Sequence, residues 1–214
     1  MAADEGSAPT APATADAHLI EHRIDSEQVF HGKLLDVRRD LIRLPGGDTA
    51  TREYIVHPGA VMVVPLLDDG RLVMERQHRY PVGRVLLEFP AGKLDPGESP
   101  QVCAQRELAE ETGYSAAEWA RACLIHNACA YSTEGIEIWF ARGLVAGEAS
   151  LDHGELIELA LTTADELDVL ARQGELTDAK TLIGLLWLQN WHAGHWPLTW
   201  VAAEANSAPI IAPT

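Results

Sequence analysis

Residues 92–114 read GKLDPGESPQVCAQRELAEETGY and hold four glutamates and one arginine in a short span. Ser99 is a residue type that often caps the start of a helix, and Pro100 suits the first helical position. Gly113 is typical of the position just after a helix. The stretch therefore predicts a loop, a helix over residues 100–112 and a tight turn.

In such a helix Glu107 and Glu111 lie one turn apart on the same face, with Glu110 beside them. Like charges at that spacing repel by a few tenths of a kcal/mol per pair, and Arg106 offsets only part of this. Leu108 lies on another face and can be buried, which would anchor the helix. Two interpretations follow, a solvated acidic helix or a platform of carboxylates for Mg²⁺ or Mn²⁺.

The rest of the chain predicts an α+β protein, an αβα sandwich in which strands dominate the middle. Apolar runs such as AVMVVPLL read as buried strands, and DAKTLIGLLWLQNWHAG has apolar residues at helical spacing. Strands around VFHGKLLDV and RRDLIRL are followed by the glycine-rich turn PGGDT and then by a strand at TREYIV, and such a short sheet must pack on its own chain or on a second subunit to be stable. The predicted divisions are a disordered tail (1–17), a β extension for dimerisation (18–56), the main domain (57–200) and a C-terminal tail (201–214).

Composition and charge exclude several classes of function. The net charge of −16 argues against nonspecific binding to nucleic acid or to anionic lipid, which requires basic patches. No run approaches the ~20 apolar residues of a membrane span, and the first residues lack the pattern of a secretory signal. Three cysteines without metal-binding spacing favour a reduced, cytoplasmic setting and argue against zinc.

The spacing of Gly92, Glu98 and the segment 106–113 resembles the Nudix box of the Nudix hydrolase superfamily. Five residues separate Gly92 from Glu98, and seven separate Glu98 from Arg106. Tyr114 stands where an aliphatic residue is usual, a mild departure. The resemblance implies the Nudix fold and a loop–helix–loop that binds a divalent metal at a nucleoside diphosphate linked to another moiety.

Further motifs resemble the ADP-ribose pyrophosphatase branch of that superfamily over about residues 28–192. They are TREYIVHPGAV, RQHRYPVG, LEFPAGKLDPGE and TDAKTLIGLLWLQ. The branch implies Mg²⁺- or Mn²⁺-dependent hydrolysis of ADP-ribose to AMP and ribose 5-phosphate, in a homodimer that exchanges its N-terminal strands. Cys129 replaces a proline that marks the branch, so another nucleotide sugar such as GDP-mannose stays open. A nucleotide-binding regulator and a hydrolase of oxidised nucleotides are weaker alternatives.

The resemblance also assigns roles within the box. It implies that the metal ligands are the backbone carbonyl of Ala91 and the side chains of Glu107 and Glu111. Glu110 would belong to the same cluster, and Arg106 would orient the carboxylates. Glu98 is either a further ligand through water or a structural partner of the loop. Gly92 and Gly113 are expected to supply backbone angles that other residues resist.

A second set of implied residues lies in the segment ASLDHGELIEL, after a predicted strand. Glu155 matches a metal-binding glutamate, and His153 stands where many relatives have a glutamate proposed as the catalytic base. His153 could be the base because its pKa lies near the working pH. Alternatively Glu155 or Asp152 takes this role, or His153 is a surface residue and a box glutamate acts as base.

Four residues match positions that contact substrate in the branch: Phe30, Arg52, Arg79 and Glu134. An arginine suits phosphate geometry, and Phe30 is placed to stack on adenine. The arginines could instead form ordinary salt bridges on strand surfaces, and Phe30 could pack in the core of the N-terminal strands.

Overall fold

The computed structural model describes residues 16–204, so most of the two predicted tails lies outside the described residues. The chain forms two compact units. The first ends at His57 and includes Ala130–Ser132, and the second comprises Pro58–Cys129 and the residues from Thr133 onward.

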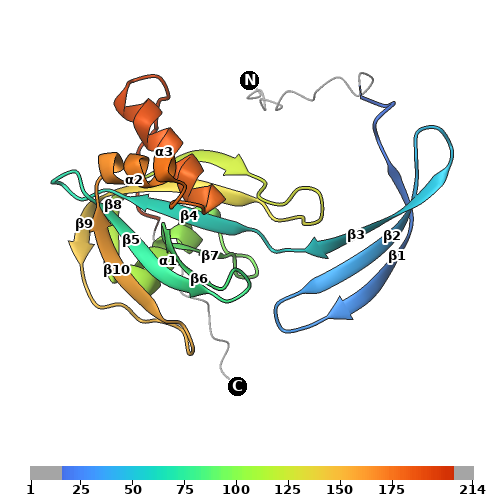
Figure 1. The fold of residues 1–214 in the computed structure, drawn as a ribbon, viewed down its shortest axis with the longest axis horizontal. Coiled ribbons are helices and arrows are strands. Elements are labelled where there is room, and N and C mark those ends of the chain that lie inside the picture. The colour runs from blue at the N-terminus through green and yellow to red at the C-terminus, as the bar shows by residue number, and fades with distance from the viewer. Residues whose placement is uncertain (1–15, 205–214) are drawn as a thin grey trace, which may run out of the picture. The chain divides into compact units, whose positions relative to one another are not determined.

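The first unit is a three-stranded antiparallel sheet in the order β1-β2-β3 (Figure 1). Its strands are β1 (His22–His31), β2 (Asp36–Arg43) and β3 (Thr49–Val56). The predicted N-terminal strands and their hairpin turn are confirmed, and Gly47 in that turn has a φ of 98°. Every residue of β1 is exposed, because so small a sheet has little interior of its own.

The described part of the second unit contains one antiparallel sheet, one mixed sheet and three helices. One sheet has the order β10-β5-β6 and the other β11-β8-β9-β4-β7, in which only the β4–β9 pairing is parallel among the described strands. The elements are β4 (Ala60–Pro65), β5 (Leu72–Arg79), β6 (Arg84–Glu88), β7 (Ala91–Lys93), α1 (Pro100–Thr112), β8 (Tyr114–Ile125), β9 (Ile136–Ala146), β10 (Ile157–Thr162), α2 (Ala164–Gln173), α3 (Ala179–His192) and β11 (Val201–Ala202).

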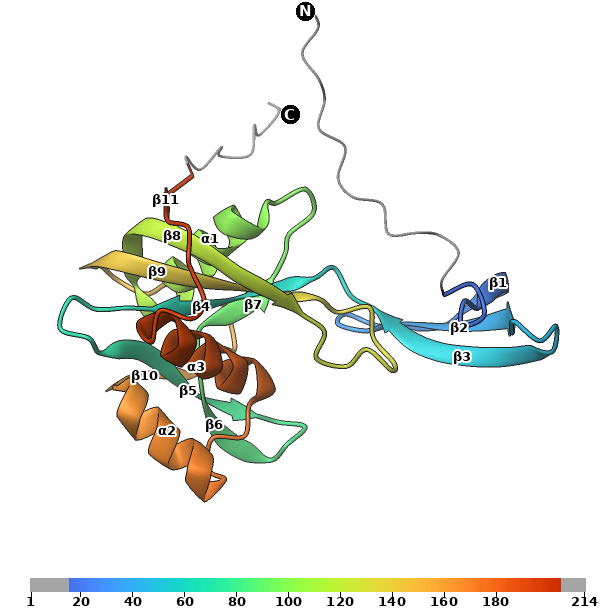
Figure 2. The same ribbon diagram turned by 90° about the horizontal axis from the view of Figure 1, so that it is seen from above.

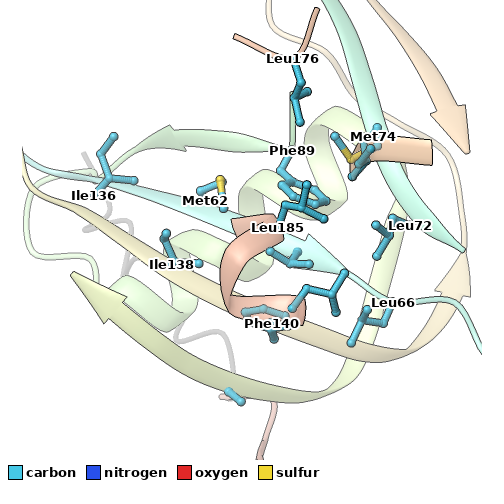
Figure 3. Packing of buried hydrophobic residues seen from close by; sticks show 14 of the residues in the cluster. Met62, Leu66, Leu72, Met74, Phe89, Ile136, Ile138, Phe140, Leu176 and Leu185 are labelled. Carbon is cyan, nitrogen blue, oxygen red and sulfur yellow. The ribbon is translucent and has the colours of Figure 1, made fainter. Parts of the chain in front are cut away.

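Strand β4 is central, and all six of its residues are buried. Its alternate side chains enter two cores, as the pleat of a strand requires. Val61 and Val63 pack in the cluster that includes Leu108 of α1, whereas Met62 packs with Leu185 of α3. Figure 2 shows α1 and α3 on opposite faces of this sheet, and Figure 3 shows the core on the α3 side. The predicted α+β class and αβα sandwich are confirmed.

Helix α1 begins and ends at the predicted residues. The Ser99 Oγ accepts a hydrogen bond from the Val102 N–H at 3.2 Å. At the other end Gly113 has a φ of 75° and donates its N–H to the Ala109 carbonyl. This confirms that Gly113 is needed for its left-handed backbone. Because β8 starts immediately afterwards, at Tyr114, this strand begins earlier than the predicted run around ACLIHNA.

Strand β10 and helix α2 were not among the elements expected from the sequence. Their junction nevertheless carries a capping box, in which the side chains of Thr163 and Glu166 each bind the other residue's backbone N–H. Within the part of the chain that the structure covers, no helix is long and apolar enough to cross a membrane.

Candidate active site

The carboxylates of α1 open into a cavity of about 530 Å³ in the second unit. Leu108, Cys103 and Ala104 are fully buried on the other side of the helix, so packing against β4 and β9 fixes which face is free. The cavity is lined by the box residues Arg106, Glu107, Glu110 and Glu111, by Ala91, Gly92 and Lys93 of β7, and by residues from several other segments, Arg79, Glu134, Asp152, Glu155, Asp178 and Lys180 among them.

Arg106 is the centre of the hydrogen-bond network in the box. Its Nε and Nη2 donate to the two carboxylate oxygens of Glu98, each at 2.9 Å. Its Nη1 donates to Glu107 at 2.8 Å and to Glu110 at 3.1 Å. Nη2 also reaches the Lys93 carbonyl at 3.0 Å, which ties the helix to β7. These contacts give Arg106 the geometry expected of a residue that orients the box carboxylates.

Glu98 has the contacts of a structural residue. Besides its paired bonds from Arg106, it accepts the Asp95 N–H at 3.0 Å and so closes the loop before α1. The Arg106 guanidinium holds the pKa of Glu98 below its usual range. Glu98 is also absent from the described residues that line the cavity. This geometry favours the structural interpretation over the one in which Glu98 binds metal through water.

Glu111 and Glu75 form a buried pair of carboxyl groups at the base of the cavity wall. Their exposures are 7% and 2%, and each carboxyl group affects the pKa of the other. The Ala91 N–H donates to Glu111 at 3.0 Å. Burial raises the pKa of Glu111, and the nearby charges of Glu75 and Glu107 raise it further. Burial likewise raises the pKa of Glu75. The two groups therefore favour sharing a proton over carrying two adjacent negative charges.

Gly92 is required because of its missing side chain. A Cβ at this position would lie 1.9 Å from the carboxyl carbon and one oxygen of Glu107. Gly92 is not among the described glycines with positive φ, so the expectation that its backbone angles require glycine is wrong. The close approach places the Glu107 carboxylate directly against β7, next to Ala91.

The donor set fits a hard divalent cation. Burial raises the pKa values of Glu75, Glu107 and Glu111, because a carboxylate removed from water is less stable in its charged form. Glu75 Oε1 is buried without a hydrogen-bond partner among the described atoms. Carboxylate and carbonyl oxygens are the ligands that Mg²⁺ and Mn²⁺ prefer. No three His, Cys, Asp or Glu side chains in residues 16–204 are already grouped to hold an ion, so the full ligand set stays a prediction.

The loop after β9 is fastened to the end of α1 and supplies two acidic groups. Its Ser150 N–H donates to the Glu110 carbonyl at 2.8 Å. Asp152 and Glu155 line the cavity, and the Asp152 N–H donates to Glu155 at 3.2 Å. His153 is exposed and is not among the described lining residues. The geometry thus favours Asp152 or Glu155 over His153 as the group that acts on a proton.

The four expected substrate residues belong to different units. Arg79 and Glu134 line the cavity of the second unit. Arg52 lies on β3 of the first unit, where its guanidinium makes two hydrogen bonds to the carboxylate of Glu21. Phe30 lies on β1 and is 55% exposed, so the alternative that it packs in the core of that sheet is wrong.

Three of the residues found in or behind the cavity wall were missed by the sequence reasoning. Glu75 is the first charged residue after the buried run of β5, where an apolar side chain would continue the pattern. Lys180 lies in the first turn of α3, where the helix dipole disfavours a cation. Glu88, at the end of β6, is 2% exposed and pairs with both Arg79 and Lys180. In each case the sequence offered one signal, which was a charged residue at a position where the local structure disfavours charge.

Comparisons with known proteins agree with this geometry. Residues 56–183 match the NUDIX domain family, and residues 21–55 match the nucleoside diphosphate sugar hydrolase N-terminal domain. An ADP-ribose pyrophosphatase of Bacillus subtilis is 36% identical over 80% of this chain and 94% of its own length. A methanol dehydrogenase activator of Bacillus methanolicus is 37% identical over 79% of this chain and 92% of its own.

The fold has a counterpart among solved structures. A crystal structure of an ADP compounds hydrolase superposes with a TM-score of 0.73 at 24% identity, covering 81% of this chain and 95% of the other. This likeness supports the predicted Nudix fold.

Proposed function

The chain belongs to the NUDIX domain family and is a Nudix hydrolase, and from this premise we propose that it cleaves nucleoside diphosphate sugars with Mg²⁺. ADP-ribose is the proposed substrate, with AMP and ribose 5-phosphate as products. In this reaction water attacks one of the two phosphorus atoms, and the bond between that phosphorus and the oxygen that bridges the two phosphates breaks. The bridging oxygen leaves with the other phosphate.

The observation that carries the proposal is the cavity in which Glu107, Glu110, Glu111 and Glu155 meet. Two further observations support the class of substrate. The N-terminal strands match a domain of nucleoside diphosphate sugar hydrolases, and a relative that this chain resembles over most of its length is an ADP-ribose pyrophosphatase.

The proposed roles follow from the contacts. Glu107, Glu111 and the Ala91 carbonyl would hold Mg²⁺, with Glu155 completing the set. The ion, when bound, offsets the charge of the phosphates and lowers the pKa of water. Arg106 keeps the Glu107 and Glu110 carboxylates in one orientation through its bonds to both.

Two residues that the structure places around the cavity would act on the reactants themselves. Glu155 is the proposed base, because it lines the cavity on a loop that is tied to α1 through Ser150. A carboxylate there can accept the proton that the attacking water releases. Arg79 would bind phosphate oxygens from its own position in the lining.

We further propose a cytoplasmic homodimer joined through the predicted β extension, residues 18–56. Apolar side chains of this unit are exposed in the single chain, including Ile24 at 45% and Val29 at 36%. Burying such side chains against a second copy would be favourable. Light scattering on the purified protein should give twice the chain mass of 23.3 kDa, and a monomer would contradict this proposal.

The deciding experiment compares kcat/KM with Mg²⁺ for ADP-ribose, ADP-glucose, GDP-mannose, NADH and 8-oxo-dGTP. We expect the highest value for ADP-ribose, with equal amounts of the two products. A preference for GDP-mannose would move the chain to the alternative that Cys129 leaves open. Binding of nucleotide sugars without turnover of any would instead show a nucleotide-binding regulator.

A further inference from the structure

A second wall of the cavity is formed by a cluster of ion pairs that involves four residues. The Arg79 Nε and Nη2 donate to the two oxygens of Glu88 at 2.8 and 2.9 Å. The Lys180 ammonium pairs with the same Glu88 carboxylate and with Asp178 Oδ2, the latter at 3.0 Å. Arg79, Asp178 and Lys180 line the cavity, while Glu88 lies behind them.

Two members of the cluster, Glu88 and Lys180, are largely buried, whereas Arg79 is partly exposed. The side chain of Glu88 is 2% exposed, that of Lys180 is 11% exposed and that of Arg79 is 39% exposed. Burial alone would raise the pKa of Glu88, but its bonds to Arg79 and Lys180 outweigh this effect, and the pKa lies below its usual value. Glu88 is therefore a fixed negative charge to which two cations are attached.

The backbone around the cluster is also fixed. The residue after Glu88, Phe89, donates its N–H to Thr181 Oγ1 at 3.1 Å. The Thr181 N–H in turn donates to Asp178 at 2.9 Å, which caps the start of α3. These two bonds join the end of β6 to the first turn of α3. Glu88 and Lys180 thus lie on segments that these bonds hold together.

Helix stability does not explain the position of Lys180. It lies in the first turn of α3, where the positive end of the helix dipole opposes a cation. Burying an ion pair also costs desolvation energy, and replacing such a pair by apolar side chains of similar volume often leaves stability unchanged or increases it. We therefore attribute the positive charge at this position to an interaction of Lys180 with a ligand in the cavity.

The charge balance of the cavity shows what that role is. Of the described residues that line it, eight are acidic and four are basic. One of the four, Arg106, is engaged with Glu98, Glu107 and Glu110. A substrate with two phosphates would meet mostly negative groups, even with cations bound at the box. Arg79 and Lys180 are paired as well, with Glu88 and Asp178, and they place cationic N–H donors on the wall away from α1.

We propose that Glu88 is a positioning residue that fixes Arg79, whose role toward phosphate is part of the proposed function, and that Lys180, fixed by the same carboxylate, is a second cation that binds the diphosphate of the substrate. The proposal rests on the proposed function, since it concerns the same cavity. Donor geometry supports it. Arg79 has five N–H donors and uses Nε and Nη2 for Glu88, while Lys180 has three and uses two for Glu88 and Asp178. Each cation keeps donors for phosphate oxygens.

The test compares Lys180→Met, Lys180→Arg and Glu88→Gln with the wild type. Glu118→Gln is the matched control, because Glu118 pairs with Arg142 at 2.8 Å on β8 and β9 and does not line the cavity. KM and kcat are measured with ADP-ribose. The Kd of α,β-methylene ADP-ribose, which cannot be hydrolysed between its phosphates, is measured by calorimetry with Mg²⁺. The Mg²⁺ concentration for half-maximal rate and the unfolding temperature are recorded for each variant.

We expect Lys180→Met to raise both KM and Kd by about tenfold or more, the size of a lost charge-assisted hydrogen bond. Lys180→Arg should recover most of this loss. Glu88→Gln should weaken binding further, because it releases both cations. The Mg²⁺ requirement should stay that of the wild type in all of them, as should every value for Glu118→Gln.

Other results would overturn the inference. If Lys180→Met lowers the unfolding temperature but leaves KM and Kd unchanged, the cluster only stabilises the fold. Lys180→Met keeps the Arg79–Glu88 pair, so this arm decides the question even if Glu88→Gln does not fold. Wild-type turnover of ADP-ribose with unchanged binding by the variants would refute this inference and leave the proposed function standing. A wild type that neither binds nor hydrolyses any nucleotide sugar would refute both.

Discussion

Replacing Gly92 by alanine should damage the active site without damaging the fold. A Cβ at residue 92 would lie 1.9 Å from the Glu107 carboxyl group, whereas ordinary contact begins at 3.4 Å. The carboxylate must therefore move by about 1.5 Å, since the Cβ is fixed to the strand. Glu107 would then lose its place against β7 beside the Ala91 carbonyl.

The size of the effect follows from that displacement. A shift of about 1 Å in a catalytic group can cost about a hundredfold in rate, which corresponds to about 2.7 kcal/mol of barrier. We therefore expect Gly92→Ala to lower kcat/KM by about a hundredfold. Gly92 does not have a positive φ, so alanine fits its backbone, and the smaller freedom of the unfolded chain offsets part of any clash. The unfolding temperature should change little.

Steady-state kinetics with ADP-ribose at several Mg²⁺ concentrations provide the assay. Gly46→Ala is the matched control, because Gly46 also lacks a positive φ and a Cβ there would meet nothing within 4 Å. A double-mutant cycle isolates the cause. If Gly92→Ala acts by moving Glu107, it should have almost no further effect in a Glu107→Ala background. Wild-type kcat/KM in Gly92→Ala, or an equal loss in both backgrounds, would refute the reasoning.

Three more predictions concern individual carboxylates and the loop. Glu111→Gln should lower Mg²⁺-dependent kcat/KM by more than about a hundredfold, the upper end for residues that merely support a ligand. The variant should stay folded in a thermal melt, because the raised pKa of Glu111 shows that its buried position favours an uncharged side chain. Normal turnover would exclude Glu111 as a ligand. His153→Ala should leave the pH dependence of kcat/KM unchanged, because His153 does not line the cavity, and a shifted limb would make it the base. The lowered pKa of Glu98 stabilises the fold above its usual value of 4.5, and this contribution disappears as the pH falls through the lower value of the folded state. Glu98→Gln should therefore flatten the acid limb of the free energy of unfolding, measured in urea between about pH 2 and pH 6, and an unaltered limb would refute the role of the Arg106 pair.

Local signals made the central part of the fold predictable. Helix α1 could be predicted to the residue, because Ser99, Pro100 and Gly113 each have a conformational preference that acts within a few residues. Strand β4 was equally clear, since burial on both faces requires a continuous apolar run. For α2 the capping box of Thr163 and Glu166 is a local signal in the sequence. The apolar side of this helix is small, because only Leu167 is fully buried.

The site was predictable only where a motif specifies it. The box side chains have fixed spacing, so their convergence follows from one helix. Glu75 and Glu88 lie outside the box and meet it through sheet pairing, in which Glu75 is directly opposite Glu88. Lys180 lies on α3 and pairs with Glu88, from which it is separated by 92 positions in the sequence. No local pattern encodes contacts of this kind, because they depend on how the whole domain packs.

The structure also distinguishes glutamates that the sequence makes look alike. Glu98 accepts two hydrogen bonds from Nε and Nη2 of Arg106, and its pKa is lowered, so it remains an anion that holds the loop. Glu107 and Glu111 are buried, and this burial raises their pKa values, although Arg106 also donates to Glu107. Burial therefore distinguishes Glu107 and Glu111, which still favour a cation, from Glu98, which Arg106 already neutralises. This division explains why a chain with a net charge of −16 concentrates glutamates on a single helix. Their repulsion weakens the free protein locally and strengthens the binding of any ion that relieves it.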